Sequence, residues 1–520
     1  MQGKKHYQEK LFTHFQLSDR IPESNFYRRL HQALDLQFLY VLTKEYYGSC
    51  GQKSIDPVVF FKMSLVGYLE NIISDRKLVE FCGMRLDVLY FLGYDIDEAL
   101  PWHSTISRTR QLLPENVFNA IFDKVLGLCI SKKMVGGHTQ AIDSAFVKAN
   151  ASMDSLELKV PAESLLEHLA KVRVLSSADR PAKTDKSTAE QRIITADRQK
   201  LQEIKTRNKK WSKEQDQRPG AGNKGSKYTS NKTHYSPVDP DARISVKPGK
   251  ARKLNYLSQL SVDTTHHVIT HIHADYADQK DNQCLQQTVN GLTARLSHQG
   301  IKVTTLLADA GYSSGENYAY LEDKGIESYI PPHGTYKGGP EGFVYNREGN
   351  YWLCRQGKHV TFRKQRLEKG TLKDLYFTRR SDCKGCPLKT LCIGKSYEKK
   401  ISITAYREEY ERAIARLKSH AGKYHKGKRM STVEPVFGSL LNYYGMRKVN
   451  TIGIKQANKQ MLMAATAYNL KKWLKFEFKL RISLSKPQKM AKKMIKKGHK
   501  MLAIWNLCCI KPQYACHPSF

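Results

Sequence analysis

The stretch "LLADAGYSSGENYAYLEDKGI", residues 306–326, places a carboxylate where an apolar strand meets a turn. The apolar run ends at Asp309, and Gly311 then turns the chain away. Helical periodicity follows in "SGENYAYLEDKG", and a further strand is predicted in "ESYIPP". An aspartate at such a junction is either a turn-forming residue or part of a site, and its partners decide between the two.

The segments before this stretch predict a sheet around it. Strand patterns occupy "HTQAIDSAFVKANAS" (138–152), "KLNYLSQLSVD" (253–263) and "HVITHIHAD" (267–275), and the last two are close enough to form a hairpin. A helix is predicted in "QCLQQTVNGLTARLSHQG", ending at Gly300. Strand, hairpin, helix, strand, helix and strand in this order indicate an α/β fold with a mixed sheet flanked by helices.

The rest of the chain divides by composition. Residues 24–130 are helical in period almost throughout, and Asp56 followed by Pro57 is a typical helix start. We therefore predict an all-α N-terminal domain, an α/β domain with a basic insertion and a small cysteine-rich insertion, and a basic C-terminal tail. The predicted bounds are 1–135 for the first domain, 136–475 for the second with insertions at 175–250 and 335–400, and 476–520 for the tail.

The charge of the chain points to a polyanionic partner. Its 520 residues hold 86 Lys and Arg against 49 Asp and Glu, a formal net charge of +37. Such an excess favours nucleic acid first and an anionic membrane second. No apolar run reaches the roughly 18 residues of a membrane span, and the N-terminus lacks the apolar region of a signal peptide. Eleven cysteines in a chain this long favour reduced thiols or metal ligands in the cytoplasm.

Two further carboxylates stand beside apolar patterns. Asp143 lies inside the apolar strand "TQAIDSAFV", so it either points to solvent at a strand edge or has partners, because burying an unpaired charge costs several kcal/mol. Glu434 flanks an apolar helical stripe, but Ser431 and Glu434 also fit a capping box at the first turn of that helix. Brought together with Asp309, these carboxylates would repel each other unless cations lay between them. Oxygen ligands suit Mg²⁺ or Mn²⁺, and two such ions catalyse phosphoryl transfer.

These segments resemble a known class of enzymes. The stretches around Asp143, Asp309 and Glu434 are similar to the D, D and E blocks of bacterial insertion-sequence transposases of the DDE class. "SPVDPDARISVKPGK" (236–250) and "DPVVFFKMSLVGYLENIISDRKLVEFCG" (56–83) match one branch of that class. The resemblance covers roughly residues 20–475.

The resemblance implies a ribonuclease H-like core in which Asp143, Asp309 and Glu434 bind Mg²⁺ or Mn²⁺. It also implies an N-terminal domain that helps bind the terminal inverted repeats of the element. Such an enzyme cuts DNA at the element ends and joins the 3′-hydroxyl to target DNA. It acts as a homodimer or larger assembly, in the bacterial cytoplasm with nucleoid DNA.

Several basic residues are predicted to contact DNA. Arg108 and Arg110 lie on a short helix that Ser104 can cap, where they suit phosphate contacts or form an ordinary solvated face. Related transposases carry a Tyr, an Arg and a Lys at set distances around the Glu, but Leu440 and Leu441 stand where the Lys is expected. The predicted DNA-binding set is Arg108, Arg110, Arg429, Arg447 and Lys448.

Other polar groups have two interpretations each. Cys354, Cys383, Cys386 and Cys392 have the spacing of a structural zinc site, with reduced thiols as the alternative. A second set alternates along one strand and could hold a metal, although an exposed strand face is favoured; it consists of His271, His273 and Asp275. A third pair, Asp239 and Asp241, is predicted to form a turn, with orientation of DNA or of a metal-bound water as the alternative.

Two other functions remain open on the sequence. One is a catalytically inactive DNA-binding protein derived from a transposase, although the presence of all three carboxylates favours activity. The other is a metal-dependent nuclease that cuts without strand transfer. DNA cleavage and DNA joining assays distinguish these alternatives from a transposase.

Overall fold

The computed structural model describes residues 16–48, 50, 54–158, 230–231, 234–245, 252–334, 336, 338–368 and 370–478. Most of the predicted basic insertion, residues 175–250, lies outside the described residues. The predicted basic tail, 476–520, lies outside them beyond residue 478.

The N-terminal part is helical, as predicted. Its longest early helix, α4 (Pro57–Leu69), starts where the sequence indicates, because the Asp56 side chain accepts the backbone N–H groups of Val58 and Val59. The other elements here are α1 (Leu17–Arg20), α2 (Phe26–Ala33), α3 (Phe38–Thr43), η1 (Lys44–Tyr46), α5 (Asp75–Gly83), α6 (Leu86–Leu92), α7 (His103–Leu112) and α8 (Glu115–Ser131). These helices share one hydrophobic core with the sheet described next.

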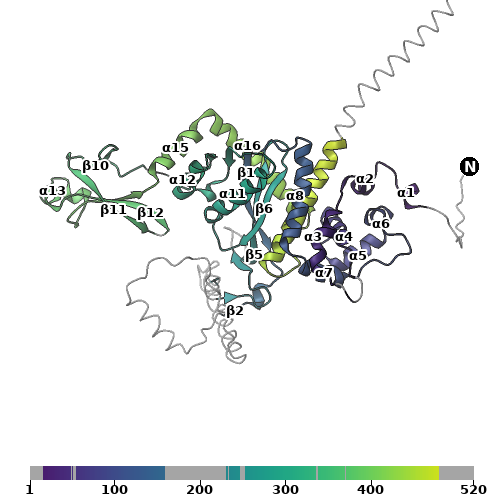
Figure 1. Ribbon diagram of the computed structural model, residues 1–520. Coiled ribbons are helices and arrows are strands. Elements are labelled where there is room, and N and C mark those ends of the chain that lie inside the picture. The colour runs from purple at the N-terminus through teal and green to yellow at the C-terminus, as the bar shows by residue number, and fades with distance from the viewer. Residues whose placement is uncertain are drawn as a thin grey trace, which may run out of the picture.

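A mixed sheet forms the centre of the molecule (Figure 1). Its strands are β1 (Thr139–Lys148), β4 (Arg243–Ser245), β5 (Lys253–Asp263), β6 (Ile269–Tyr276), β7 (Thr305–Leu307) and β8 (Glu327–Tyr329). β5 pairs antiparallel with β1, β4 and β6, whereas β7 pairs parallel with both β1 and β8. The order β6-β5-β1-β7-β8 is that of a ribonuclease H-like sheet, which confirms the predicted fold class.

Helices from three parts of the chain cover this sheet. α11 (Asp281–Ser297) contacts β5 and β6, and α16 (His420–Tyr443) contacts β1 and β5. A last helix over residues 454–478 bonds to β6 and lies beside α8, as the yellow and blue ribbons of Figure 1 show. Short elements complete this part: η2 (Met153–Ser155), β2 (Glu157–Leu158), β3 (His234–Tyr235), η5 (Ala310–Tyr312) and α12 (Gly315–Asp323).

A second sheet projects from the core as an arm (Figure 1). We call it the insertion sheet; its antiparallel strands are β9 (Val344–Asn346), β10 (Tyr351–Leu353), β11 (His359–Glu368), β12 (Thr371–Phe377) and β13 (Lys400–Thr404). Helices α13 (Arg380–Lys384) and α14 (Lys389–Cys392) join its last two strands. It has a small hydrophobic core of its own, made by Trp352, Val360, Tyr376 and Ile401.

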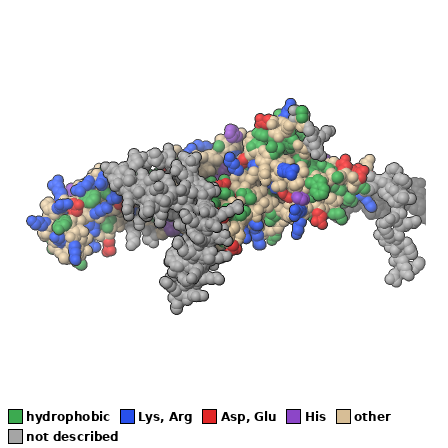
Figure 2. All heavy atoms as spheres, turned by 90° about the horizontal axis from the view of Figure 1, so that it is seen from below, with side chains coloured by type: hydrophobic (Ala, Val, Ile, Leu, Met, Phe, Trp, Pro, Cys, Tyr) green, Lys and Arg blue, Asp and Glu red, His purple; other side chains and the backbone are tan. Residues whose placement is uncertain are grey.

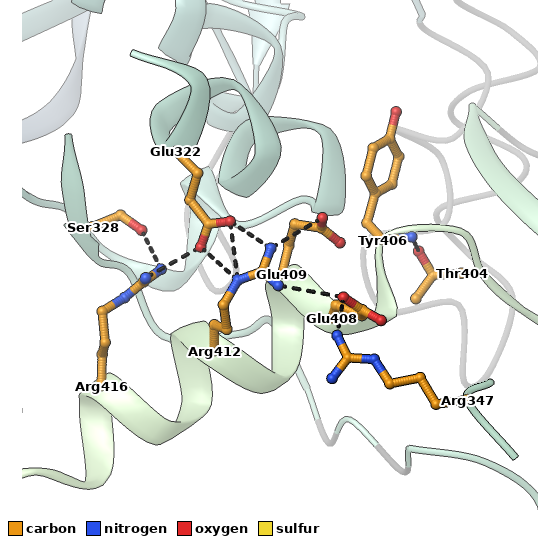
Figure 3. A network of polar contacts seen from close by, with 9 residues as sticks. All are labelled: Glu322, Ser328, Arg347, Thr404, Tyr406, Glu408, Glu409, Arg412 and Arg416. Atoms are coloured by element: carbon orange, nitrogen blue, oxygen red, sulfur yellow. Dashed lines mark hydrogen bonds and ion pairs between the residues drawn. The ribbon is translucent and has the colours of Figure 1, made fainter. Parts of the chain in front are cut away.

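Ion pairs along α15 (Arg407–Lys418) attach the insertion sheet to the core (Figure 3). Glu322 of α12 accepts hydrogen bonds from Arg412 at 2.6 Å and Arg416 at 3.1 Å. On the other side, Arg347 of the insertion sheet pairs with Glu408 at 2.5 Å. One helix therefore connects both sheets, and it leads directly into α16.

No helix among the described residues is long and apolar enough to cross a membrane.

Candidate active site

Three aspartates line one cavity at an edge of the central sheet. The cavity has a volume of about 580 Å³, and Asp143, Asp281 and Asp309 all face it. Its other lining residues are Ser144, Ala145, Phe146, Leu257, Gln279, Lys280, Asn282, Gly311, Ser313 and His333.

The strand register explains why Asp143 and Asp309 lie together. β1 and β7 run parallel, and their last paired residues are Ala141 and Leu307. Each aspartate lies two residues beyond its member of that pair, just past the stretch over which β1 and β7 are hydrogen-bonded. Because the two strands run parallel and in register, equal offsets from the last pair put both aspartates at the same level of the sheet. The structure thus brings together two of the three carboxylates predicted from the sequence.

The electrostatics of Asp143 reflect this crowding. Burial, together with the negative charges of Asp309 and Asp281, raises the pKa of the Asp143 carboxyl to about 6. A bond from the Ser144 backbone N–H at 2.8 Å and the nearby Arg429 guanidinium oppose this rise in pKa. The apo site therefore holds more negative charge than its own cations compensate.

Asp309 serves as a turn-forming residue and lines the site at the same time. Its Oδ1 accepts the backbone N–H of Gly311 at 2.9 Å and so caps η5. A Cβ atom on Gly311 would lie 2.8 Å from Asp281 Oδ2 and 3.0 Å from Asp309 Oδ1. Glycine at position 311 therefore leaves the space between these two carboxylates open.

Asp281 is the cavity residue that the sequence analysis missed. It is the first residue of α11, and its Oδ1 accepts a hydrogen bond from Ser144 Oγ at 2.7 Å. An acid in the first turn of a helix is common because it interacts favourably with the helix dipole, so nothing in the pattern marks this one. The only sequence signal of Asp281 is that it follows the hairpin of β5 and β6. This hairpin lies beside β1, the strand that holds Asp143.

Glu434 lies within a helix that begins much earlier than predicted. α16 starts after Ser419, whose side chain accepts the Gly422 backbone N–H at 3.1 Å. Ser431 is therefore inside the helix and donates to the carbonyl of Lys428, so the capping-box interpretation of Glu434 is wrong. The Glu434 side chain is 58% exposed and is available to a ligand.

Arg429 connects Glu434 with the cavity. Its Nη1 lies 3.4 Å from Asp143 Oδ2, and its Nη2 lies 4.0 Å from Glu434 Oε1. The two residues are five positions apart on α16, and neither of them is among the residues that line the cavity. In this arrangement a guanidinium stands between two of the three predicted metal ligands.

The donor set of the cavity fits a hard divalent cation. The carboxylates of Asp143, Asp281 and Asp309 line the cavity together with the Ser144 hydroxyl, and oxygen is the ligand that Mg²⁺ and Mn²⁺ prefer. Among the described residues, no group of three or more His, Cys, Asp or Glu side chains is already arranged to hold a metal ion. Binding therefore requires the carboxylates to approach one another, and the predicted ligand set stays a prediction.

The four cysteines of the insertion sheet were predicted to bind zinc. Cys354 follows β10 and its Sγ accepts the Lys358 backbone N–H at 3.3 Å, while Cys383 lies 3.1 Å from Thr378 Oγ1. Cys386 and Cys392 lie near and in α14. All four are free thiols, and the zinc site gains no support from their arrangement and stays a prediction.

The predicted DNA-binding residues fall into different environments. Arg110 is buried and donates to both oxygens of Asp75 at 2.7 and 2.9 Å, so its predicted phosphate contact is wrong: the guanidinium is not accessible. Arg108, on the same helix α7, is exposed. Arg447 and Lys448 are exposed beside the end of β1, where Lys148 and Lys448 form a β-bridge.

A second set of polar groups lies on β6, and here the predicted exposed face is wrong. His271, His273 and Asp275 are buried, because α11 covers this face of the strand. The helix comes close at Gly291, where a Cβ atom would lie 2.5 Å from the His271 ring. Arg295 of α11 donates to His271 Nδ1 at 2.6 Å.

This arrangement fixes a chain of hydrogen bonds that we call the histidine ladder. Arginine can only donate, so His271 Nδ1 accepts, its Nε2 donates to His273 Nδ1 at 3.1 Å, and His273 Nε2 donates to Asp275 at 3.1 Å. Arg295 also pairs with Asp123 of α8 at 2.6 Å. Burial, followed by the electrostatic effects of the neighbouring His273 and Arg295 side chains, lowers the pKa of His271 well below its usual value, which keeps this ring neutral.

Asp239 and Asp241 have a structural role beyond a turn. Asp239 is buried and accepts the Tyr256 hydroxyl at 2.6 Å and the Gly453 backbone N–H at 3.2 Å. Asp241 accepts the Ile454 backbone N–H at 3.0 Å. The pair therefore caps the helix over residues 454–478.

The fold therefore places three carboxylates in one cavity beside a ribonuclease H-like sheet. Residues 15–112 match the transposase domain family DUF772, and residues 353–474 match the family of transposase DDE domains. The chain thus carries two transposase domains, and the predicted DDE transposase class is confirmed. Transposase DDE domains form a class of metal-dependent enzymes that cut and transfer DNA strands.

Solved structures and curated proteins add little to these family matches. A Mos1 transposase paired-end complex with left transposon end shows 12% identity, over 60% of this chain and 73% of that chain, with a TM-score of 0.15. A pre-cleavage Mos1 transpososome shows 11% identity over 62% and 76%, also with a TM-score of 0.15. Such low scores do not establish a shared fold, so the fold assignment rests on the strand order. No curated protein matches the chain significantly.

Proposed function

We propose that this protein is a DNA transposase that cuts at the ends of an insertion sequence and joins the freed 3′-hydroxyl to target DNA. The observation that carries the proposal is the meeting of Asp143 and Asp309 just past the paired stretch of the parallel strands β1 and β7, in a chain with a transposase DDE domain. The net charge of +37 supports a polyanionic substrate.

Asp143, Asp309 and Glu434 would hold Mg²⁺ or Mn²⁺ in this proposal. When bound, a pair of such ions supplies activation of the attacking oxygen and stabilisation of the leaving oxygen of a phosphodiester. Arg429 compensates part of the carboxylate charge until ligands gather, since it lies beside both Asp143 and Glu434. The Ser144 hydroxyl donates to Asp281 and so holds this fourth carboxylate toward the cavity.

The remaining parts of the proposal concern DNA. Helices of residues 1–135 would help bind the terminal inverted repeats, with Arg108 exposed for phosphate contact. Arg429, Arg447 and Lys448 would hold phosphates close to the carboxylates, because the β-bridge of Lys148 to Lys448 places them beside strand β1. The protein would act as at least a dimer, because two element ends must be paired. This assembly would work in the bacterial cytoplasm.

An assay with three readouts tests the proposal. The protein is incubated with Mg²⁺, a labelled duplex that carries an end of its element, and a plasmid target. Joined products support transposition, whereas cleavage without joining supports the nuclease, and binding without cleavage supports the inactive derivative. Either of the last two results, obtained with correctly folded protein, contradicts the proposed strand transfer.

A further inference from the structure

A second cavity lies between the insertion sheet and the loop that leaves the central sheet. Its volume is about 810 Å³. Three lysines line it from β12, β13 and the residue before β13: Lys373, Lys400 and Lys399. The other lining residues are Pro332, His333, Tyr336, Gly338, Gly339, Pro340, Thr371, Ile401, Ser402, Ile403, Thr404 and Tyr410.

This lysine cavity adjoins the carboxylate cavity. His333 lines both of them. Its backbone N–H donates to Ser313 Oγ at 2.8 Å, and Ser313 lines the carboxylate cavity. A chain molecule that occupies one cavity can therefore continue into the other past His333.

The charges in the lysine cavity are only partly compensated. Glu368 lies 3.4 Å from Lys373 Nζ and 3.9 Å from Lys400 Nζ, so one carboxylate serves two lysines. Lys399 donates to the carbonyl of Cys392 at 3.0 Å and has no ion pair among the described residues. Figure 2 shows further Lys and Arg side chains gathered over the end of the molecule that the insertion sheet forms.

The strand register increases this positive charge. Arg366 of β11 is paired directly opposite Lys373 of β12. Like charges at directly opposed positions destabilise a sheet. Arg366 has no ion-pair partner within the described part of the chain to offset this. Such an arrangement is favourable only when an anion lies over it.

An aromatic wall completes the cavity. The rings of Tyr336 and Tyr410 stack with centroids 5.1 Å apart and planes at 4°. The Tyr336 hydroxyl is buried and has no hydrogen-bond partner among the described residues. Because this hydroxyl oxygen is closed off from solvent, the two tyrosines contribute an aromatic wall to the cavity and not an exposed donor.

We propose that the lysine cavity binds backbone phosphates of the DNA strand that runs through the carboxylate cavity. The inference rests on the proposed function, and it assigns to Lys373, Lys399 and Lys400 the task of holding that strand in register with the carboxylates. Phosphates match the observed chemistry, which combines partly compensated ammonium groups with an aromatic wall and lacks a partner carboxylate for each lysine.

Salt-dependent binding of a fluorescent DNA duplex to the full-length protein, measured without divalent metal, tests this inference. Each phosphate contact contributes about 0.9 to the slope of log K against log salt concentration. Changing all three cavity lysines, as Lys373→Gln/Lys399→Gln/Lys400→Gln, should lower the slope by about 2 to 3. The matched control is Lys358→Gln/Lys384→Gln/Lys395→Gln, which removes three exposed lysines of the same region outside the cavity and should change the slope by less than about 1.

Two further variants keep the test decisive if the triple variant fails to fold. Ser402→Glu adds a negative charge at an exposed position of the cavity and should weaken binding at least fivefold. The Lys→Arg triple variant should retain the slope of the wild type. Equal slopes for the cavity and control variants, with Ser402→Glu without effect, would overturn the inference.

The outcome is separable from that of the proposed function, because binding is measured without metal. If the wild-type protein joins DNA and the cavity variant keeps the wild-type salt slope, the proposed role of the lysine cavity is refuted and the proposed function is not. If the wild-type protein binds DNA through the cavity but neither cuts nor joins it, the proposed function is refuted and the role of the lysine cavity is not.

Discussion

The carboxylate cavity and the histidine ladder lie on strands of the same sheet, and both contact α11. In the ladder, each group has a partner: Arg295 is paired with Asp123, and the bonds continue through His271 and His273 to Asp275. In the cavity, Asp143 instead faces two other carboxylates, and its pKa is raised to about 6 by burial and by these neighbours.

This difference separates a structural polar network from a candidate site. Buried polar groups that satisfy one another need nothing from outside and hold their elements together. Buried carboxylates that face one another keep an unfavourable energy that only an added cation relieves. Both sets contain aspartates next to α11 and the same sheet, so it is the pattern of partners that distinguishes them.

The largest expected effect comes from Asp309→Asn. Asparagine keeps the cap on Gly311, since Asn and Asp are comparable capping residues, but it removes a metal-binding charge. We expect DNA cleavage to fall by about a thousandfold or more, which corresponds to about 4 kcal/mol of barrier, with an unchanged melting temperature. Single-turnover cleavage and thermal unfolding measure the two effects. Cleavage at the wild-type rate would mean that Asp309 is only a turn-forming residue.

Next in size is the effect of Arg295→Met on stability. The variant removes the donor to His271 and leaves Asp123 without its partner, so we expect a loss of about 2 to 4 kcal/mol in the free energy of unfolding. Urea denaturation provides the measurement. Arg412→Met in the network of Figure 3 is the matched control; its side chain is 45% exposed, and its loss should cost less than about 1 kcal/mol. Equal losses would show that the ladder contributes no more than a surface network.

Asp143→Asn should change the free energy of unfolding in the opposite direction, because it should stabilise the metal-free protein. A carboxyl whose folded-state pKa exceeds its unfolded value destabilises the fold when ionised, so the penalty appears as the pH rises from about 4 through about 6. Removing the charge should add about 1 to 3 kcal/mol at pH 8 and almost nothing at pH 4. Denaturation at both pH values tests this, with the exposed Asp97→Asn as control. A stability gain that is independent of pH would contradict the crowding of charges.

The smallest effect is expected for Asp281→Asn. The amide retains an oxygen for Ser144 Oγ but removes the charge, so we expect cleavage to slow by about tenfold, as is usual for groups that orient metal ligands. The rate should be measured across Mg²⁺ concentrations. A loss as large as that of Asp309→Asn would make Asp281 a direct ligand, whereas no loss at all would remove it from the site.

The predictable part of the molecule is the part with local signals. The hairpin of β5 and β6, the cap of α4 and the strand–helix–strand unit around Asp309 all follow from periodicity and turn chemistry. The resemblance implied that Asp143 and Asp309 belong to one ribonuclease H-like core, but the parallel pairing of β1 with β7 was not predicted. Given that pairing, the side-by-side position of the two aspartates needs no more than the register of the two strands.

The parts that failed depend on contacts between distant segments. Alternating polar residues on β6 normally indicate a solvated face, but α11 covers this one because Gly291 permits a close approach. The start of α16 was missed since Gly422 and its polar neighbours lack apolar periodicity. Asp281 was missed because an acid at a helix start is ordinary in its local context, and only the folded sheet brings it opposite Ser144.

The parallel pairing of β1 with β7 also has a consequence for synthesis of the chain. Parallel strands are never joined by a tight turn, and here β1 ends at Lys148 whereas β7 begins only at Thr305, after a long stretch of sequence. Such non-local contacts form late in folding. The nascent chain exposes Asp143 long before Asp309 emerges, and Glu434 follows only after the whole insertion sheet. A ribosome-bound chain that ends before residue 434 can bind DNA through its basic helices, but it lacks the third carboxylate and should not cut it.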